Sequence, residues 1–79
     1  MNEFEQLVLG SFEHWGKDKL DLHTLFEGGG NEPEARTEIF YAVERLVAQG
    51  LLREEGNDFY SLTDKGKAAA ISGKLSDKL

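Results

Sequence analysis

The chain has 79 residues, of which 39% are hydrophobic, and its 9 basic and 15 acidic side chains give a net charge of −6. A chain of this length forms one domain and buries only about 60% of its unfolded surface, which leaves room for two packed layers but excludes a deep cavity. The chain has no cysteine, so disulfides and thiolate chemistry are excluded.

The charge is distributed unevenly along the chain. Residues 1–60 hold 5 basic and 13 acidic side chains, whereas residues 61–79 hold four lysines and two aspartates. A surface that binds nucleic acid non-specifically has the reverse balance over most of its area, because its affinity comes mostly from lysine and arginine displacing counterions. No apolar run approaches the roughly 20 residues that cross a bilayer, so we expect no membrane partner. The first residues, MNEFEQLVLG, lack the basic start and apolar centre of a signal peptide, so the cytoplasm is the expected location.

The first predicted element is a helix that ends at Gly16. Asn2 and Glu5 have the spacing of a capping box, in which each side chain satisfies a backbone N–H of the other residue. Apolar side chains then recur at helical spacing: Phe4, Leu7, Val8, Phe12 and Trp15. The short polar connection over residues 17–20 is a candidate strand.

Two further helices are predicted before the middle of the chain. Asp21 can cap a brief helix that carries Leu22, Leu25 and Phe26 and ends at a run of three glycines. The next helix is the strongest helical signal in the chain. Asn31 and Glu34 predict a second capping box, Pro33 is tolerated in the first turn, and Gly50 ends the helix. Its inward stripe consists of Ile39, Val43, Leu46 and Val47.

A hairpin and a last helix complete the predicted elements. Residues 51–55 and 59–62 flank a loop of turn-forming residues, Gly56 to Asp58, which is typical of a β-hairpin. Thr63 is a suitable N-cap for a helix that reaches Ile71 and can continue to Leu75. We expect the inward side chains of the third helix and the hairpin to pack against Phe4, Val8 and Leu25.

The hairpin and its flanks carry a recognisable pattern: a glycine, two leucines, a charged hairpin, and then Y-x-L-T-x-x-G. The residues that fit it in order are Gly50, Leu51, Leu52, Tyr60, Leu62, Thr63 and Gly66. Over about residues 34–70 the chain therefore resembles the winged helix-turn-helix of PadR-like and MarR-like bacterial regulators. The resemblance implies a mostly helical α+β fold, with three helices, a β-hairpin wing and a C-terminal helix. We expect one winged-helix domain over residues 1–72, with residues 73–79 as a frayed tail or a helical extension.

The resemblance also implies a small DNA-binding protein, most simply a transcriptional regulator, whose third helix enters the major groove of double-stranded DNA. With the apolar stripe inward, a wheel at about 100° per residue turns six side chains outward: Glu34, Thr37, Glu38, Tyr41, Arg45 and Ala48. Thr37, Tyr41 and Arg45 are the expected DNA contacts on this face. Arg36 can reach a phosphate from the helix start, and Arg53 corresponds to the wing arginines of DNA-binding relatives. The alternative is a solvated helix face on which Arg45 contacts a neighbouring side chain.

The same surface also has features of a protein interface. Glu34 and Glu38 would repel the DNA backbone, and the hairpin sets three acids against one arginine. If strand alternation turns Tyr60 inward, Phe59 points outward, and an exposed aromatic beside acids suits a protein partner. Packing of Phe59 against Trp15 or the last helix is the alternative. The second hypothesis is therefore an acidic winged-helix module that binds a basic protein without direct DNA contact.

The lysine-rich end of the chain suggests a further partner. A symmetric homodimer through residues 63–79 would let two modest DNA contacts act together. The apolar positions of this segment are Ala68, Ile71, Leu75 and Leu79.

Enzyme and metal chemistry are not expected. His14 and His23 lie on different predicted elements, without cysteine or a His-x-x-x-His pair, so they predict no metal site. The glycines at 28–30 follow no strand and precede no Gly-Lys-Ser/Thr sequence, which excludes a phosphate loop. No nucleophile has a plausible base beside it, so we expect neither catalysis nor a cofactor.

Overall fold

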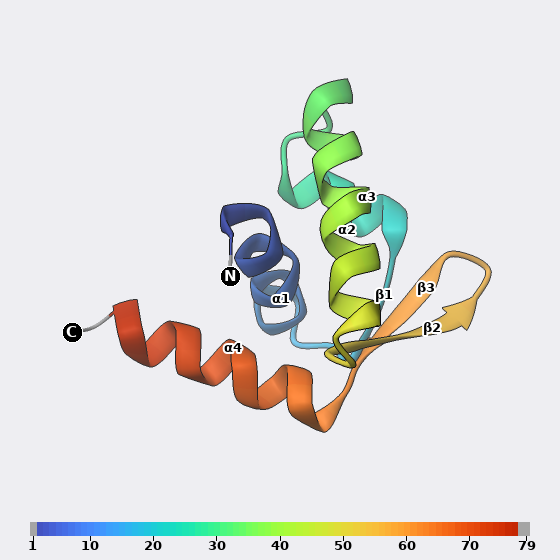
Figure 1. The fold of residues 1–79 in the computed structure, drawn as a ribbon. Helices are drawn as coiled ribbons and strands as arrows, with labels where there is room; N and C mark the ends of the chain where they lie inside the picture. Colours follow the sequence, from blue (N-terminus) through green and yellow to red (C-terminus); the bar gives the residue numbers. More distant parts are fainter. Residues whose placement is uncertain (1, 78–79) are drawn as a thin grey trace.

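The computed structural model describes the backbone of residues 2–77 and the side chains of residues 2–71. This part of the chain forms four helices and three strands (Figure 1). In chain order they are α1 (Glu3–Trp15), β1 (Lys19–Asp21), α2 (Leu22–Gly28), α3 (Pro33–Ala48), β2 (Leu52–Gly56), β3 (Phe59–Leu62) and α4 (Asp64–Asp77). The predicted α+β class with mostly helical content is confirmed, and the arrangement is compatible with a winged helix.

The first helix begins and ends as its sequence predicts. The backbone N–H of Asn2 donates to Glu5 Oε1 at 2.9 Å, and the Glu5 N–H donates to Asn2 Oδ1 at 2.8 Å. Gly16 adopts a left-handed conformation with φ 64°, which costs glycine little because it has no Cβ. The N–H groups of Gly16 and Lys17 then donate to the carbonyls of Glu13 and Phe12, which completes a Schellman motif.

The predicted capping box at the start of α3 is wrong. The N-cap is Glu32, which makes no side-chain capping bond, and Asn31 lies in the preceding loop with φ 65°. The reason is Pro33, whose fixed φ and missing N–H suit the first helical position and whose ring holds the preceding residue extended. Glu32 accordingly has ψ 144°, and the Asn31 N–H donates to the Phe26 carbonyl at the end of α2.

The three strands form one antiparallel sheet with the order β1-β3-β2. The predicted strand near residues 17–20 is confirmed as β1, and Leu20 pairs with Tyr60. The hairpin is also confirmed, with a two-residue loop rather than the predicted three. Asn57 and Asp58 have φ 53° and 64°, the sign that both loop residues of a type I′ turn require. Gly56 belongs to β2, next to a register shift in the pairing with β3.

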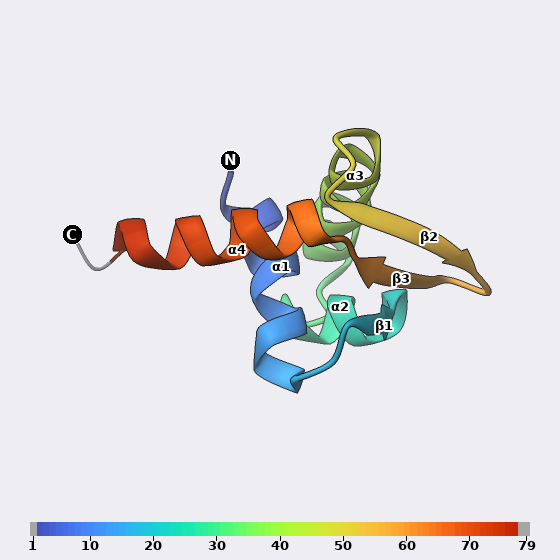
Figure 2. The same cartoon turned by 90° about the horizontal axis from the view of Figure 1, so that it is seen from below.

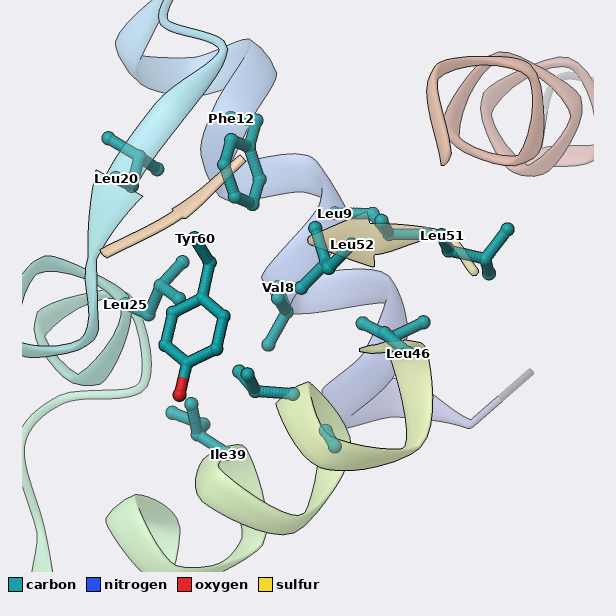
Figure 3. Packing of buried hydrophobic residues seen from close by; sticks show 12 residues of the cluster. Val8, Leu9, Phe12, Leu20, Leu25, Ile39, Leu46, Leu51, Leu52 and Tyr60 are labelled. Carbon is teal, nitrogen blue, oxygen red and sulfur yellow. The ribbon is translucent and has the colours of Figure 1, made fainter. Parts of the chain in front are cut away.

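The hydrophobic core lies between α1, α2, α3 and the sheet (Figure 3). Seven of the predicted core residues are buried: Val8, Leu25, Ile39, Val43, Leu46, Leu52 and Tyr60. Phe4 and Leu62 are only half-buried at its margin. The ring of Tyr60 crosses the core from the sheet toward Ile39, so that one side chain joins β3 to α3 (Figure 3).

The chain segments that follow α3 and β3 meet at a tight junction, which we call the α3–α4 junction and define by Gly50, Leu51, Thr63 and Gly66. The single hydrogen of the Thr63 hydroxyl is shared between the carbonyls of Gly50 at 2.7 Å and Leu51 at 3.0 Å, and Oγ1 accepts the Gly66 N–H at 3.0 Å. Thr63 is therefore the N-cap of α4, as predicted. A Cβ at Gly66 would lie 2.1 Å from the Leu51 carbonyl oxygen, so only glycine fits this close approach.

The last helix leaves the body of the molecule. Its first turns lie near α1, where Ala69 and Ala70 are half-buried against the core, and its second half extends away in both views (Figures 1 and 2). Ile71 is 60% exposed. Residues 73–77 continue the helix in their backbone, and the remainder of the expected tail, residues 78–79, lies outside the described residues.

Candidate functional site

The exposed side of α3 carries three of the five side chains that were predicted to bind DNA. Arg36, Thr37 and Tyr41 are exposed, and 53% of Tyr41 is accessible. Thr37 Oγ1 donates to the Pro33 carbonyl of its own helix at 3.1 Å, which leaves its oxygen lone pairs open to solvent. Arg36 makes no ion pair among the described residues.

Arg45, the other α3 residue that was predicted to bind DNA, pairs with an acid of α1, and 42% of its side chain remains exposed. The structure turns it toward α1, where its Nε lies 3.2 Å from Glu5 Oε2. Glu5 is only 6% exposed. A hydrogen bond from the Asn2 backbone and then the Arg45 guanidinium hold the pKa of Glu5 below its ordinary value, although burial opposes them. Arg45 also has a buried Nη2 without a hydrogen-bond partner within the described part of the chain. Arg45 therefore helps to join α3 to α1.

Arg53 lies on the hairpin as predicted, but it has an acidic neighbour. Its Nε is 3.8 Å from Glu55 Oε2, and 76% of its side chain is exposed. The Ser61 hydroxyl also donates to Glu55. This hydrogen bond and then the charge of Arg53 lower the pKa of Glu55. The positive charge of the wing is thus largely balanced within the wing itself.

Three carboxylates of α3 and the hairpin act electrostatically on the Tyr60 side chain. Burial raises the pKa of Tyr60, and the negative charges of Glu54, Asp58 and Glu44 raise it further. Glu44 comes from α3, whereas Glu54 and Asp58 come from the hairpin and its loop. We call these three carboxylates the acidic junction. It places negative potential where α3 and the hairpin meet.

Exposed aromatic rings lie on the same two elements. Phe40 and Tyr41 are 37% and 53% exposed, and their ring centroids are 6.1 Å apart. Phe59 of β3 is 41% exposed, so its predicted outward orientation is confirmed. Sequence reasoning missed Phe40 because it sits beside the inward stripe. The helical wheel places Phe40 about 100° from Ile39, at the edge of the buried face. This position could have predicted that its ring is partly exposed.

The two histidines lie on separate helices. His14 of α1 stacks edge-on against Trp15 with ring centroids 5.4 Å apart, and His23 Nε2 of α2 lies 3.2 Å from Glu27 Oε1. Within residues 2–77, no helix combines the length and the apolar character that a membrane span needs.

No family model matches the chain, and no curated protein and no solved structure matches it either. Its function is therefore inferred from its own residues.

Proposed function

We propose that this chain is a winged-helix module that binds a basic protein surface through α3 and the β2–β3 hairpin. One observation carries the proposal: the acidic junction lies on the same elements as an exposed aromatic pair, and two nearby arginines are already paired with carboxylates. Glu44 follows Phe40 by four residues, so these two side chains lie on the same side of α3. Aromatic anchors that become buried beside charged residues are typical of protein interfaces.

Two observations support a winged-helix fold: the order of the helices and strands, and the positions of the residues that match the winged-helix sequence pattern. The Y-x-L-T-x-x-G residues and Gly50 fill the core or form the α3–α4 junction. Their contacts contribute to the fold. The resemblance therefore supports the fold more directly than it supports DNA binding.

The charges favour a protein over a phosphate backbone. The α3–hairpin face is rich in acids, because Glu34 and Glu38 add to the acidic junction. Of its arginines, Arg45 and Arg53 are paired with carboxylates, and Arg36 has no ion pair among the described residues. The carboxylates of Glu5 and Glu55 already neutralise part of the charge of Arg45 and Arg53, which weakens the attraction of both arginines to a phosphate. A basic protein surface would instead be attracted to these carboxylates, which would speed its association at low salt.

The test is affinity capture from cell extract with the wild-type chain and two matched variants, followed by binding measurements with each purified candidate partner. We expect basic proteins to be retained by the wild type and lost with Phe40→Ser/Tyr41→Ser, whose dissociation constant should rise at least tenfold because aromatic anchors dominate interface energies. Glu3→Gln, which removes one exposed charge from the first turn of α1 and leaves the exposed aromatic rings in place, is the control and should bind normally. Equal binding by the wild type and the aromatic variant would contradict the proposal.

DNA is the second candidate, favoured by the family resemblance and by the joint exposure of Arg36, Thr37 and Tyr41 on α3. The test is a ¹⁵N–¹H NMR titration with a mixed-sequence duplex at low and then moderate salt. If the chain binds DNA, chemical-shift changes should be confined to residues 34–48. Added salt should remove them, because the face has few lysines and arginines to displace the counterions of DNA and its binding would be weak. Arg36→Ala should abolish these shifts. A complete lack of shifts at low salt would remove generic DNA binding and leave the protein partner.

A further inference from the structure

A groove between α1 and α2 lies apart from the α3–hairpin face. It has a volume of about 440 Å³, within the usual range for small-molecule sites. Its lining residues are Leu7, Gly10, Ser11, His14, Trp15, Glu27 and Gly28. The C-terminal end of α1, which forms one wall, lies well away from the tip of the hairpin in both views (Figures 1 and 2).

The floor of this groove contains a glycine that the chain itself does not require. Gly10 stands in the middle of α1, where glycine is a poor helix former. Apart from its chain neighbours and the backbone of its own helix, a Cβ there would meet no atom of the described residues within 4 Å, so Gly10 faces open space. Gly28 is different, because its Cβ would lie 3.2 Å from Ser11 Oγ and helix packing accounts for it. Gly10 therefore leaves this part of the groove open, with room for a molecule from outside the chain.

The walls of the groove define the chemistry of that molecule. Trp15 is 48% exposed, and the edge-on contact with His14 orients its ring. Glu27 brings a carboxylate from α2, and its neighbour His23 is 71% exposed and thus easily displaced. The Ser11 hydroxyl donates to the Leu7 carbonyl, which leaves its oxygen as an acceptor. A cation is attracted both to the face of an indole and to a carboxylate.

We infer that this groove binds a small organic cation: an ammonium, amidinium or guanidinium group on a flat or aliphatic body. The charged group would lie between Trp15 and Glu27, and the body would rest over Gly10 against Leu7. The net charge of −6 raises the local concentration of such cations. This site is independent of the proposed protein interface.

The experiment is a titration with benzamidinium, read by tryptophan fluorescence and by the NMR signal of the indole N–H. Trp15 is the single tryptophan of the chain, so both signals report on the groove directly. We expect a saturable change with benzamidinium in the millimolar range, as befits a ligand of nine heavy atoms. Benzamide has nearly the same shape without the charge, and it should bind at least tenfold more weakly.

Three variants locate the site. Gly10→Leu should abolish binding while raising the Tm by several degrees, because leucine fills the groove and is a better helix former. Glu27→Gln should weaken binding about tenfold, whereas Glu3→Gln changes the net charge equally and should leave binding unchanged. An undiminished response in Gly10→Leu or Glu27→Gln, or an equal response to benzamide, would overturn the inference.

A last comparison separates a free ligand from a basic side chain of a protein. The probe is a blocked Gly-Arg-Gly tripeptide, titrated under the same conditions as benzamidinium. Binding of benzamidinium with a weaker tripeptide response would support a small-molecule site. Binding of the tripeptide alone would overturn it. Phe40→Ser/Tyr41→Ser should leave benzamidinium binding intact, so failure of the proposed protein interface and failure of this site are distinguishable.

Discussion

The α3–α4 junction and the exposed face of α3 and the hairpin are built from adjoining parts of the chain, but they hold their residues in opposite ways. At the junction, the Thr63 hydroxyl bonds to three backbone groups and Gly66 touches the backbone of Leu51. On the exposed face, the side chains of Arg36 and Tyr41 make no hydrogen bond or ion pair among the described residues, although the Tyr41 ring lies against the Phe40 ring. The junction is thus required by the fold, whereas the face is available for binding. Substitutions in the two regions should therefore separate stability from binding.

The largest effect is expected for Gly66→Ala. The added methyl group would meet the Leu51 carbonyl oxygen at 2.1 Å and Leu62 Cδ1 at 2.8 Å, and backbone atoms cannot move aside as a side-chain end can. We expect a loss of about 3 kcal/mol in the free energy of unfolding, measured by urea denaturation. Gly10→Ala, which has open space, is the matched control and should gain about 0.5–1 kcal/mol. Equal effects at the two glycines would show that α4 does not approach Leu51 so closely.

Thr63→Ala should have the next largest effect, about 1–2 kcal/mol, because it removes the N-cap of α4 and the shared hydrogen bond to the Gly50 and Leu51 carbonyls. The same urea titration measures it. Thr63→Ser keeps the hydroxyl and should restore most of the lost stability. If serine fails to do so, the methyl group of threonine and not its hydroxyl stabilises the junction.

The Glu5–Arg45 pair should give a smaller effect that depends on pH. The pKa of Glu5 is lowered in the folded state, so its contribution to stability is fully present above the ordinary pKa of glutamate, about 4.3, and is lost as the pH falls through the lower folded pKa. Thermal unfolding at pH 7 and pH 3 should therefore show that this group contributes less stability at the lower pH. The Glu5→Gln variant should show a smaller difference between the two pH values. An unchanged difference would mean that other carboxylates cause the acid sensitivity.

The smallest effect on stability is expected on the exposed face. Tyr41→Ser removes a ring that is 53% exposed, and it should change the free energy of unfolding by no more than about 0.5 kcal/mol. Its effect on partner binding should nevertheless be large. A destabilisation above 1 kcal/mol would place Tyr41 among the residues that the fold requires, and would remove the contrast between the two regions.

Several local features could be read from the sequence because they depend on near neighbours in the chain. The Asn2–Glu5 box, the glycine ends of α1 and α3, the hairpin and the Thr63 cap each involve residues a few positions apart, and all are present. The Asn31–Glu34 box was mispredicted because Pro33 outweighs the capping preference of asparagine. This N-cap could also have been predicted from near neighbours, because proline favours the first position of a helix and so makes Glu32 the N-cap.

The position of each charged side chain was decided by the tertiary structure. Arg45 is 40 residues from Glu5, and no local pattern indicates that α3 brings it against α1. The common electrostatic effect of Glu44, Glu54 and Asp58 on Tyr60 and the groove between α1 and α2 depend in the same way on how the elements pack. The sequence by itself determined the elements and their ends, because backbone conformation and capping are short-range. Only the tertiary structure decided which charges are paired and which surfaces stay open, because those contacts join residues that are distant in the chain.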